Sequence, residues 1–78
     1  MKIHEISVEK AVLDNIIHND RDFIIVEQNG FEKGDLINFK IKYYDGLLMS
    51  LYVFQIKDVI TDDALKDNYC ILEFKQLK

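Results

Sequence analysis

The fold is decided by the stretch FEKGDLINFKIKYYDG, residues 31–46. The glycine of Lys33-Gly34-Asp35 can take a left-handed backbone conformation, so these three residues are predicted to form a tight turn. From Leu36 to Tyr44, apolar and polar residues alternate with period two, which is typical of a half-buried strand. Asp45-Gly46 is a strong turn signal, and Leu47 to Ile60 is predicted to return as a second long strand. The stretch therefore predicts a β-hairpin.

The length and composition indicate a single domain that spans residues 1–78. An apolar fraction of 49%, with five Phe and four Tyr, is enough for a small core and argues against disorder. The formal net charge is −4. That balance disfavours a general, charge-driven nucleic-acid binder, although it leaves room for a local basic patch.

Cys70 is the only cysteine, which excludes a disulfide framework and a cysteine-based metal site. It lies in an apolar strand pattern, so it is expected to be a small buried residue. His4, His18 and the carboxylates follow no recognised ligand spacing, so neither a metal nor a cofactor is expected. Met1 to Glu5 lack the apolar centre of a signal peptide, and no apolar run reaches a membrane-spanning length. The expected location is the cytoplasm, without a membrane partner.

One helix and three further strands are predicted around the hairpin. A short strand at Lys2 to Ile6 precedes a helix from Val8 to Ile17, where apolar residues recur at helical spacing and Ser7 is the expected N-cap. Phe23 to Val26 is apolar on both faces, as expected for a central strand, and Tyr69 to Leu77 is the closing strand. Five strands in so short a chain curl readily into a closed or nearly closed barrel, which removes exposed edges. The predicted fold class is α+β.

His4-Glu5-Ile6, an early short helix, Phe31 to Asp35 and the run Ala64 to Leu72 occur in an order that resembles a known family. It is the family of small ASCH-type, PUA-like proteins found in bacteria and their bacteriophages, and the resemblance covers nearly the whole chain. The resemblance implies a β-barrel of about five strands with one helix packed across an opening and a cleft beside that helix. It also implies RNA binding or recognition of a modified nucleoside, and some relatives are amidohydrolases that act on acetylated cytidine.

The chain departs from the family pattern between residues 18 and 30. Asn19 to Phe23 matches the family motif Asn-Asp-Arg-Asp-Phe, but it precedes the central strand, whereas the family has the motif directly before the Gly-Asp turn. An alternative alignment starts from the turn and matches Phe31 to the motif's Phe. In it, Gln28-Asn29-Gly30 stand in place of the polar residues of the motif. In neither alignment do the Lys and Thr of the amidohydrolases have a counterpart.

The densest polar cluster in the sequence is His18, Asp20, Arg21 and Asp22. Arg21 is suited to holding a phosphate or carboxylate with two parallel hydrogen bonds, and His18 to carrying a proton. The alternative is a solvated connector in which the two aspartates cap turns and pair loosely with Arg21.

Lys40, Lys42 and Tyr44 share one face of the first hairpin strand, and Lys33 at the turn extends that face. Cations for phosphates beside an aromatic ring for stacking are what a nucleic-acid surface uses. The alternative is an ordinary solvated face on which lysines guard against edge pairing. The acidic residues suggest a separate patch for a basic protein partner, or plain surface: Glu27, Glu32, Asp62, Asp63 and Asp67.

The leading prediction is therefore non-catalytic binding of RNA or a modified nucleotide. In it, Arg21, Lys40 and Lys42 contact phosphates, Tyr44 stacks on a base and His18 lies beside them. The alternative is a phage-type protein-interaction module that inhibits a host factor through an acidic surface. The third hypothesis is an acetylcytidine amidohydrolase. It ranks last because the chain lacks the residues that such enzymes use. No catalytic residue is predicted.

Overall fold

The computed structural model describes residues 1–42 and 53–77. In this part of the chain one helix and five strands follow one another in the predicted order of strand, helix and four strands. The elements are β1 (Ile3–Val8), α1 (Lys10–His18), β2 (Phe23–Glu27), β3 (Leu36–Ile41), β4 (Val53–Ile60) and β5 (Tyr69–Leu77).

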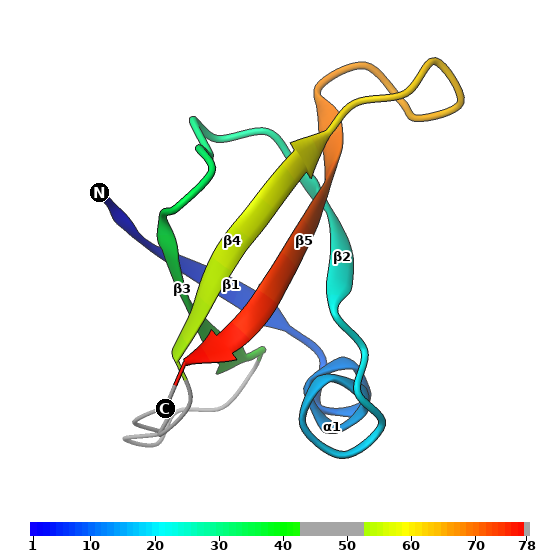
Figure 1. The fold of residues 1–78 in the computed structure, drawn as a ribbon. Coiled ribbons are helices and arrows are strands. Elements are labelled where there is room, and N and C mark those ends of the chain that lie inside the picture. The colour runs from blue at the N-terminus through cyan, green and yellow to red at the C-terminus, as the bar shows by residue number, and fades with distance from the viewer. Residues whose placement is uncertain (43–52, 78) are drawn as a thin grey trace.

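The five strands form one sheet in the order β1-β3-β4-β5-β2. β1 runs parallel to β3, and the other neighbouring strands are antiparallel. The sheet curls into a half-barrel, with α1 at the end where β1 finishes and β2 begins (Figure 1). β1 and β2 are the two edge strands, and across the described residues they do not pair with each other. The prediction of a small α+β barrel is thus confirmed in outline, with the cylinder open along one side.

The predicted hairpin is confirmed as an antiparallel pair of β3 and β4. Leu36 lies opposite Gln55 and Ile37 opposite Phe54. In each pair, the two residues are equally distant in sequence from the predicted turn at Asp45-Gly46. The predicted turn, with Tyr44, and residues 47–52 of the predicted return strand lie outside the described residues.

The turn before β3 is confirmed. Gly34 has φ +95°, a conformation that side-chain-bearing residues rarely adopt. Its N–H donates to the carbonyl of Ile56 (2.9 Å), and the N–H of Ile56 donates to the carbonyl of Asp35 (2.8 Å). The turn therefore fixes where β3 starts relative to β4.

The core is built from inward-facing residues of every element. Three phenylalanines, Phe39, Phe54 and Phe74, meet edge to face with ring centroids 5.2–5.5 Å apart. Ile37 and Leu72 are fully buried beside them, and Ile16 of α1 covers the cluster. The alternation predicted for the hairpin and for the closing strand is confirmed by this burial, which includes Cys70.

The boundary predicted between the first strand and the helix is wrong by a few residues. β1 continues to Val8, whose carbonyl accepts a hydrogen bond from the N–H of Lys42 (2.9 Å), so Ser7 lies in the strand and is no N-cap. The carbonyl of Glu9 accepts the first helical bonds, from Val12 (3.0 Å) and Leu13 (3.1 Å), and α1 begins at Lys10. Pairing with β3 extends the strand at the expense of the helix.

The prediction of a central position for Phe23 to Val26 is also wrong. β2 pairs with β5 alone and lies at the edge of the sheet. Ile24 is buried, whereas Phe23 is 42% exposed and Ile25 is 49% exposed. A strand with the composition of a central strand is thus left uncovered on one side.

Candidate functional site

A groove separates the two open edges of the half-barrel and has a cavity volume of about 630 Å³. We call it the β1–β2 groove. Its walls are the second half of β1 and most of β2, and the first residues around α1 close one end. The lining comprises Ile6 to Glu9, Val12, Ile24 to Glu27, Arg21, Lys42 and Tyr69.

Arg21 is positioned in this groove by the connector that follows α1. The carbonyl of Asn15 accepts hydrogen bonds from the N–H groups of Asn19 (3.0 Å) and Arg21 (3.2 Å), and Asp20 reverses the chain with φ +55°. The Nε of Arg21 donates to the carbonyl of Phe23 (2.9 Å), and the guanidinium carbon lies 5.0 Å from the centre of the Phe23 ring. The side chain is held along the start of β2, with its terminal nitrogens free of ion pairs in the described part of the chain.

Lys42 reaches the same groove from the end of β3. Its backbone is fixed by the hydrogen bond to Val8, and its side chain is exposed. The structure thus brings together Arg21 and Lys42, two of the cations predicted from the sequence.

Two carboxylates and one aromatic ring also line the groove. Glu9 lies at the start of α1, and Glu27 at the end of β2 lies opposite Tyr69 of β5. Tyr69 is 37% exposed, so its ring is available to a ligand. The formal charges of the two acids balance those of Arg21 and Lys42. This groove therefore suits a small ligand with both polar and flat apolar parts better than a long polyanion.

Two further predicted site residues, Lys40 and His18, lie outside the groove. Lys40 forms an ion pair with Glu5 (Nζ to Oε2, 2.7 Å) on an exposed surface outside the groove. His18 is exposed in the last turn of α1 and does not line the groove. Tyr44 falls outside the described residues. The predicted joint action of His18 and Arg21 is therefore not assembled at this groove.

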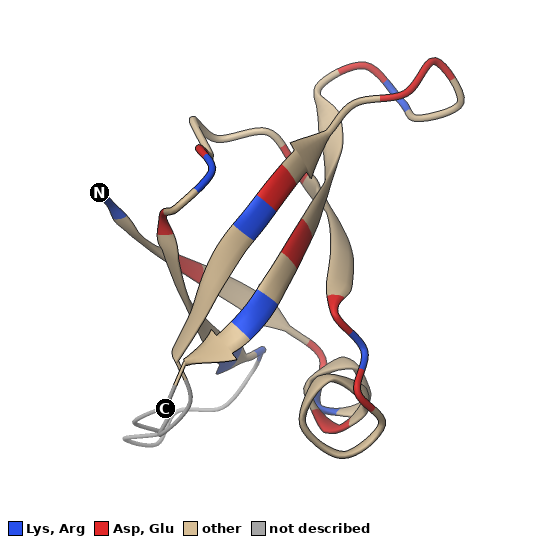
Figure 2. Cartoon of the chain, viewed as in Figure 1, with Lys and Arg blue, Asp and Glu red and all other residues tan. Residues whose placement is uncertain are grey.

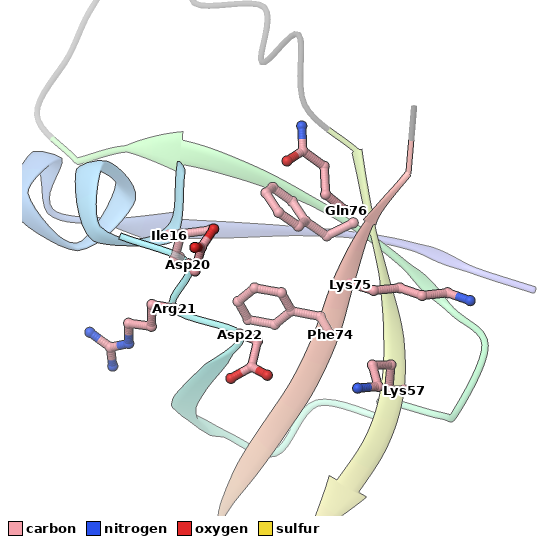
Figure 3. A pocket seen from close by; sticks show the side chains of 9 residues that line it. Ile16, Asp20, Arg21, Asp22, Lys57, Phe74, Lys75 and Gln76 are labelled. Carbon is pink, nitrogen blue, oxygen red and sulfur yellow. The ribbon is translucent and has the colours of Figure 1, made fainter. Parts of the chain in front are cut away.

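A smaller hollow of about 240 Å³ also has Arg21 in its lining (Figure 3). Its floor is apolar, with Phe74 and Ile16, and charged residues stand around it. Arg21 and Lys75 extend in opposite directions, so the cations at its rim do not converge on one point (Figure 3). The loose pairing that was predicted between Arg21 and the aspartates beside it is absent among the described ion pairs.

Sequence reasoning missed a buried pair formed by His4 and Asp35. Nε2 of His4 donates to Oδ2 of Asp35 (2.8 Å), and the Asp35 side chain is only 4% exposed. The carboxylate also accepts hydrogen bonds from the backbone N–H groups of Lys2 (3.1 Å) and Glu32 (3.2 Å). The bond from His4, and then those from the backbone, lower the pKa of Asp35 from 3.8 to about 2.

The role of the pair of His4 and Asp35 is structural. The ring of Phe31 covers His4 with centroids 4.6 Å apart, so the pair ties β1, the residues before the turn and the turn itself into one unit. A sequence signal for it exists only in part. Asp35 after Gly34 indicates a turn. Its partner His4 can be identified only once β1 is known to pair in parallel with β3, which places His4 opposite Ile37.

Known proteins and the described residues indicate no further site. The sequence matches no protein-family model and no curated protein. Residues 1–42 and 53–77 contain no group of three or more His, Cys, Asp or Glu side chains placed to hold a metal ion. Within the same residues no helix has the length and apolar character needed to cross a membrane.

Proposed function

We propose that the chain is a small PUA-like domain of the ASCH type that binds RNA or a modified nucleotide, without catalysis, in the β1–β2 groove. One observation carries the proposal: Arg21 and Lys42, from separate segments, line one groove together with the exposed ring of Tyr69. Cations that hold phosphates beside an aromatic ring on which a base stacks are the usual means of binding single-stranded RNA.

The volume and charge of the groove favour a short ligand. About 630 Å³ lies within the range of small-molecule sites, roughly 300–1,000 Å³. Glu27 lies beside Tyr69, so a base stacked on that ring would have a carboxylate acceptor near its edge. Carboxylates accept hydrogen bonds from exocyclic amino groups such as N4 of cytosine. The proposed ligand is thus one nucleotide, or a few, at the end or in a loop of an RNA.

The test is the salt dependence of RNA binding, measured by fluorescence anisotropy with a labelled single strand of about ten nucleotides. Two phosphate contacts predict a slope of about −1.4 for log K against log salt concentration, and Lys42→Ala should reduce its magnitude by about 0.7. Tyr69→Ala should weaken binding by about 1–3 kcal/mol. Lys66→Ala, in the exposed β4–β5 connection, is the matched control for the loss of one positive charge.

Lys40→Ala separates this proposal from the prediction made from the sequence alone. Because Lys40 pairs with Glu5 outside the groove, its loss should change RNA affinity no more than the Lys66 control does. No measurable RNA binding at low salt, or equal effects of all three lysine variants, would refute the assignment to this groove.

A second candidate function is favoured by the acidic connection between β4 and β5. Asp62, Asp63 and Asp67 gather in this exposed segment, which projects from one end of the sheet (Figure 2). Such a projection suits a basic protein partner, as for a phage-type inhibitor of a host factor. Capture of a host protein that is lost when the three aspartates become Asn, but not when Glu9 and Glu27 become Gln, would support this function over RNA binding.

A further inference from the structure

The edge strand β2 has a composition that its position in the sheet leaves unexplained. Its sequence, FIIVE, is apolar on both faces and contains neither Pro nor Lys, the residues that commonly protect an exposed edge. Phe23 is 42% exposed and Ile25 is 49% exposed. Strands with apolar residues on both faces are usually covered on both sides.

The backbone of β2 offers a row of hydrogen-bonding groups on its open side. The N–H of Phe74 donates to the carbonyl of Asp22 (2.9 Å), and that of Gln28 donates to the carbonyl of Asn68. Because antiparallel pairing alternates, Ile24 and Val26 face β5, and the backbone groups of Phe23, Ile25 and Glu27 face away from it. Among these outward groups, the carbonyl of Phe23 bonds to Arg21.

We propose that a second copy of the chain pairs with β2 along this edge, antiparallel, with Ile25 on the twofold axis. In this register Phe23 lies opposite Glu27 of the partner subunit, and all three outward-facing residues exchange hydrogen bonds with the same three residues of the copy. The two sheets then continue into each other, and the edge is covered.

The charges around β2 favour a second copy in this register. Arg21 lies just before the strand and Glu27 at its end, on the same face by alternation. Antiparallel pairing about Ile25 brings Arg21 diagonally next to Glu27 of the partner subunit, and symmetry repeats the contact at the other end. Parallel pairing would instead place like charges side by side. The strand is therefore complementary to itself.

The experiment measures molecular mass by light scattering and sedimentation over a wide range of protein concentration. The unmodified chain should form a dimer, and Ile25→Lys should give a monomer because two lysines would meet at the twofold axis. Ile71→Lys is the matched control, since Ile71 lies opposite Ile25 on the same outer face but in the inner strand β5. It should leave the dimer intact, and circular dichroism should show both variants to be folded.

A charge exchange tests the register. Arg21→Glu and Glu27→Arg should each raise the dimer dissociation constant about tenfold, and the double variant should restore it. A chain that is monomeric at every concentration would overturn the proposal, as would a dimer that survives Ile25→Lys or is not restored by the double exchange. A monomer that binds an unrelated extended peptide at this edge would also overturn it. Since mass is the readout, failure here leaves the RNA proposal untouched.

Discussion

At the scale of single residues, Asp35 combines burial with three hydrogen bonds, and this makes the stability of the fold sensitive to acid. Its pKa in the folded chain is about 2, below the ordinary value of 3.8. The stabilisation is therefore complete above about pH 4 and is lost as the pH falls through about 2. Asp35→Asn should lower the unfolding midpoint at pH 7 and flatten this acid dependence, as followed by thermal melts between pH 2 and 7.

The control for this prediction is Asp67→Asn, a change of the same chemistry at an exposed position. It should alter the melting temperature little and retain the acid dependence. An Asp35→Asn variant that melts with the same pH profile as the unmodified chain would show that the ionisation of Asp35 contributes nothing to the stability of the fold.

Cys70 provides a second prediction at this scale. Its side chain is fully buried in β5, and burial raises the pKa of the thiol above its ordinary value of 9.0. We expect a disulfide reagent at pH 8 to leave the folded chain unmodified and to react with one thiol as soon as denaturant unfolds it. Rapid reaction in the absence of denaturant would show that β5 opens locally.

Cys70 and Asp35 show which features a local sequence pattern can predict and which it cannot. Cys70 was predicted to be buried because it lies in an apolar strand pattern, on the same face as Leu72 and Phe74, and such a pattern depends on strand geometry alone. The pair of His4 and Asp35 joins residues 31 positions apart. Nothing local marks such a pair, because it depends on which strands become neighbours.

At the scale of elements, the turn at Gly34 sets the register of β3 against β4. With φ +95°, an added Cβ is strained although no atom lies within 4 Å of it. We expect Gly34→Ala to cost about 1–2 kcal/mol in the free energy of unfolding, measured with denaturant. Gly30→Asn is the matched control, since φ +69° is close to the left-handed region that Asn tolerates. Equal costs for the two variants would contradict this role of Gly34.

The helix and strands themselves were predicted better than the order in which the strands pair in the sheet. The helix, β3 and β5 follow from local periodicity, β2 was predicted from its apolar run, and the order along the chain is correct. Strand order in the sheet depends on long-range pairing, so the apolar run of β2 was assigned a central position that it lacks in the single chain. Pairing with a second copy would give β2 the two neighbours that its composition indicates.

At the scale of the whole molecule, the ring cluster of Phe39, Phe54 and Phe74 joins β3, β4 and β5. Phe39 is 1% exposed and contacts both other rings. Phe39→Ala should cost about 3–5 kcal/mol in the free energy of unfolding, a large share of the stability of so small a domain. Ile3→Ala, at a position 63% exposed, should change it by less than about 0.5 kcal/mol. A mild effect of Phe39→Ala would mean that the core repacks.

The last prediction links the two proposed roles of β2. Because this strand is both a wall of the β1–β2 groove and the proposed dimer edge, RNA and a second copy should compete for it. Binding equilibria that exclude each other are linked, so added RNA should shift the dimer toward monomer, and a high protein concentration should weaken RNA binding.

Light scattering of the mixture tests this, with the mass of the RNA complex expected to contain one chain. Ile25→Lys provides the control, because a chain that cannot pair should bind RNA with an affinity independent of protein concentration. If RNA binds the dimer as tightly as the monomer, the ligand does not use the wall formed by β2. Arg21 would then act only in pairing, and Lys42 and Tyr69 alone would hold the RNA.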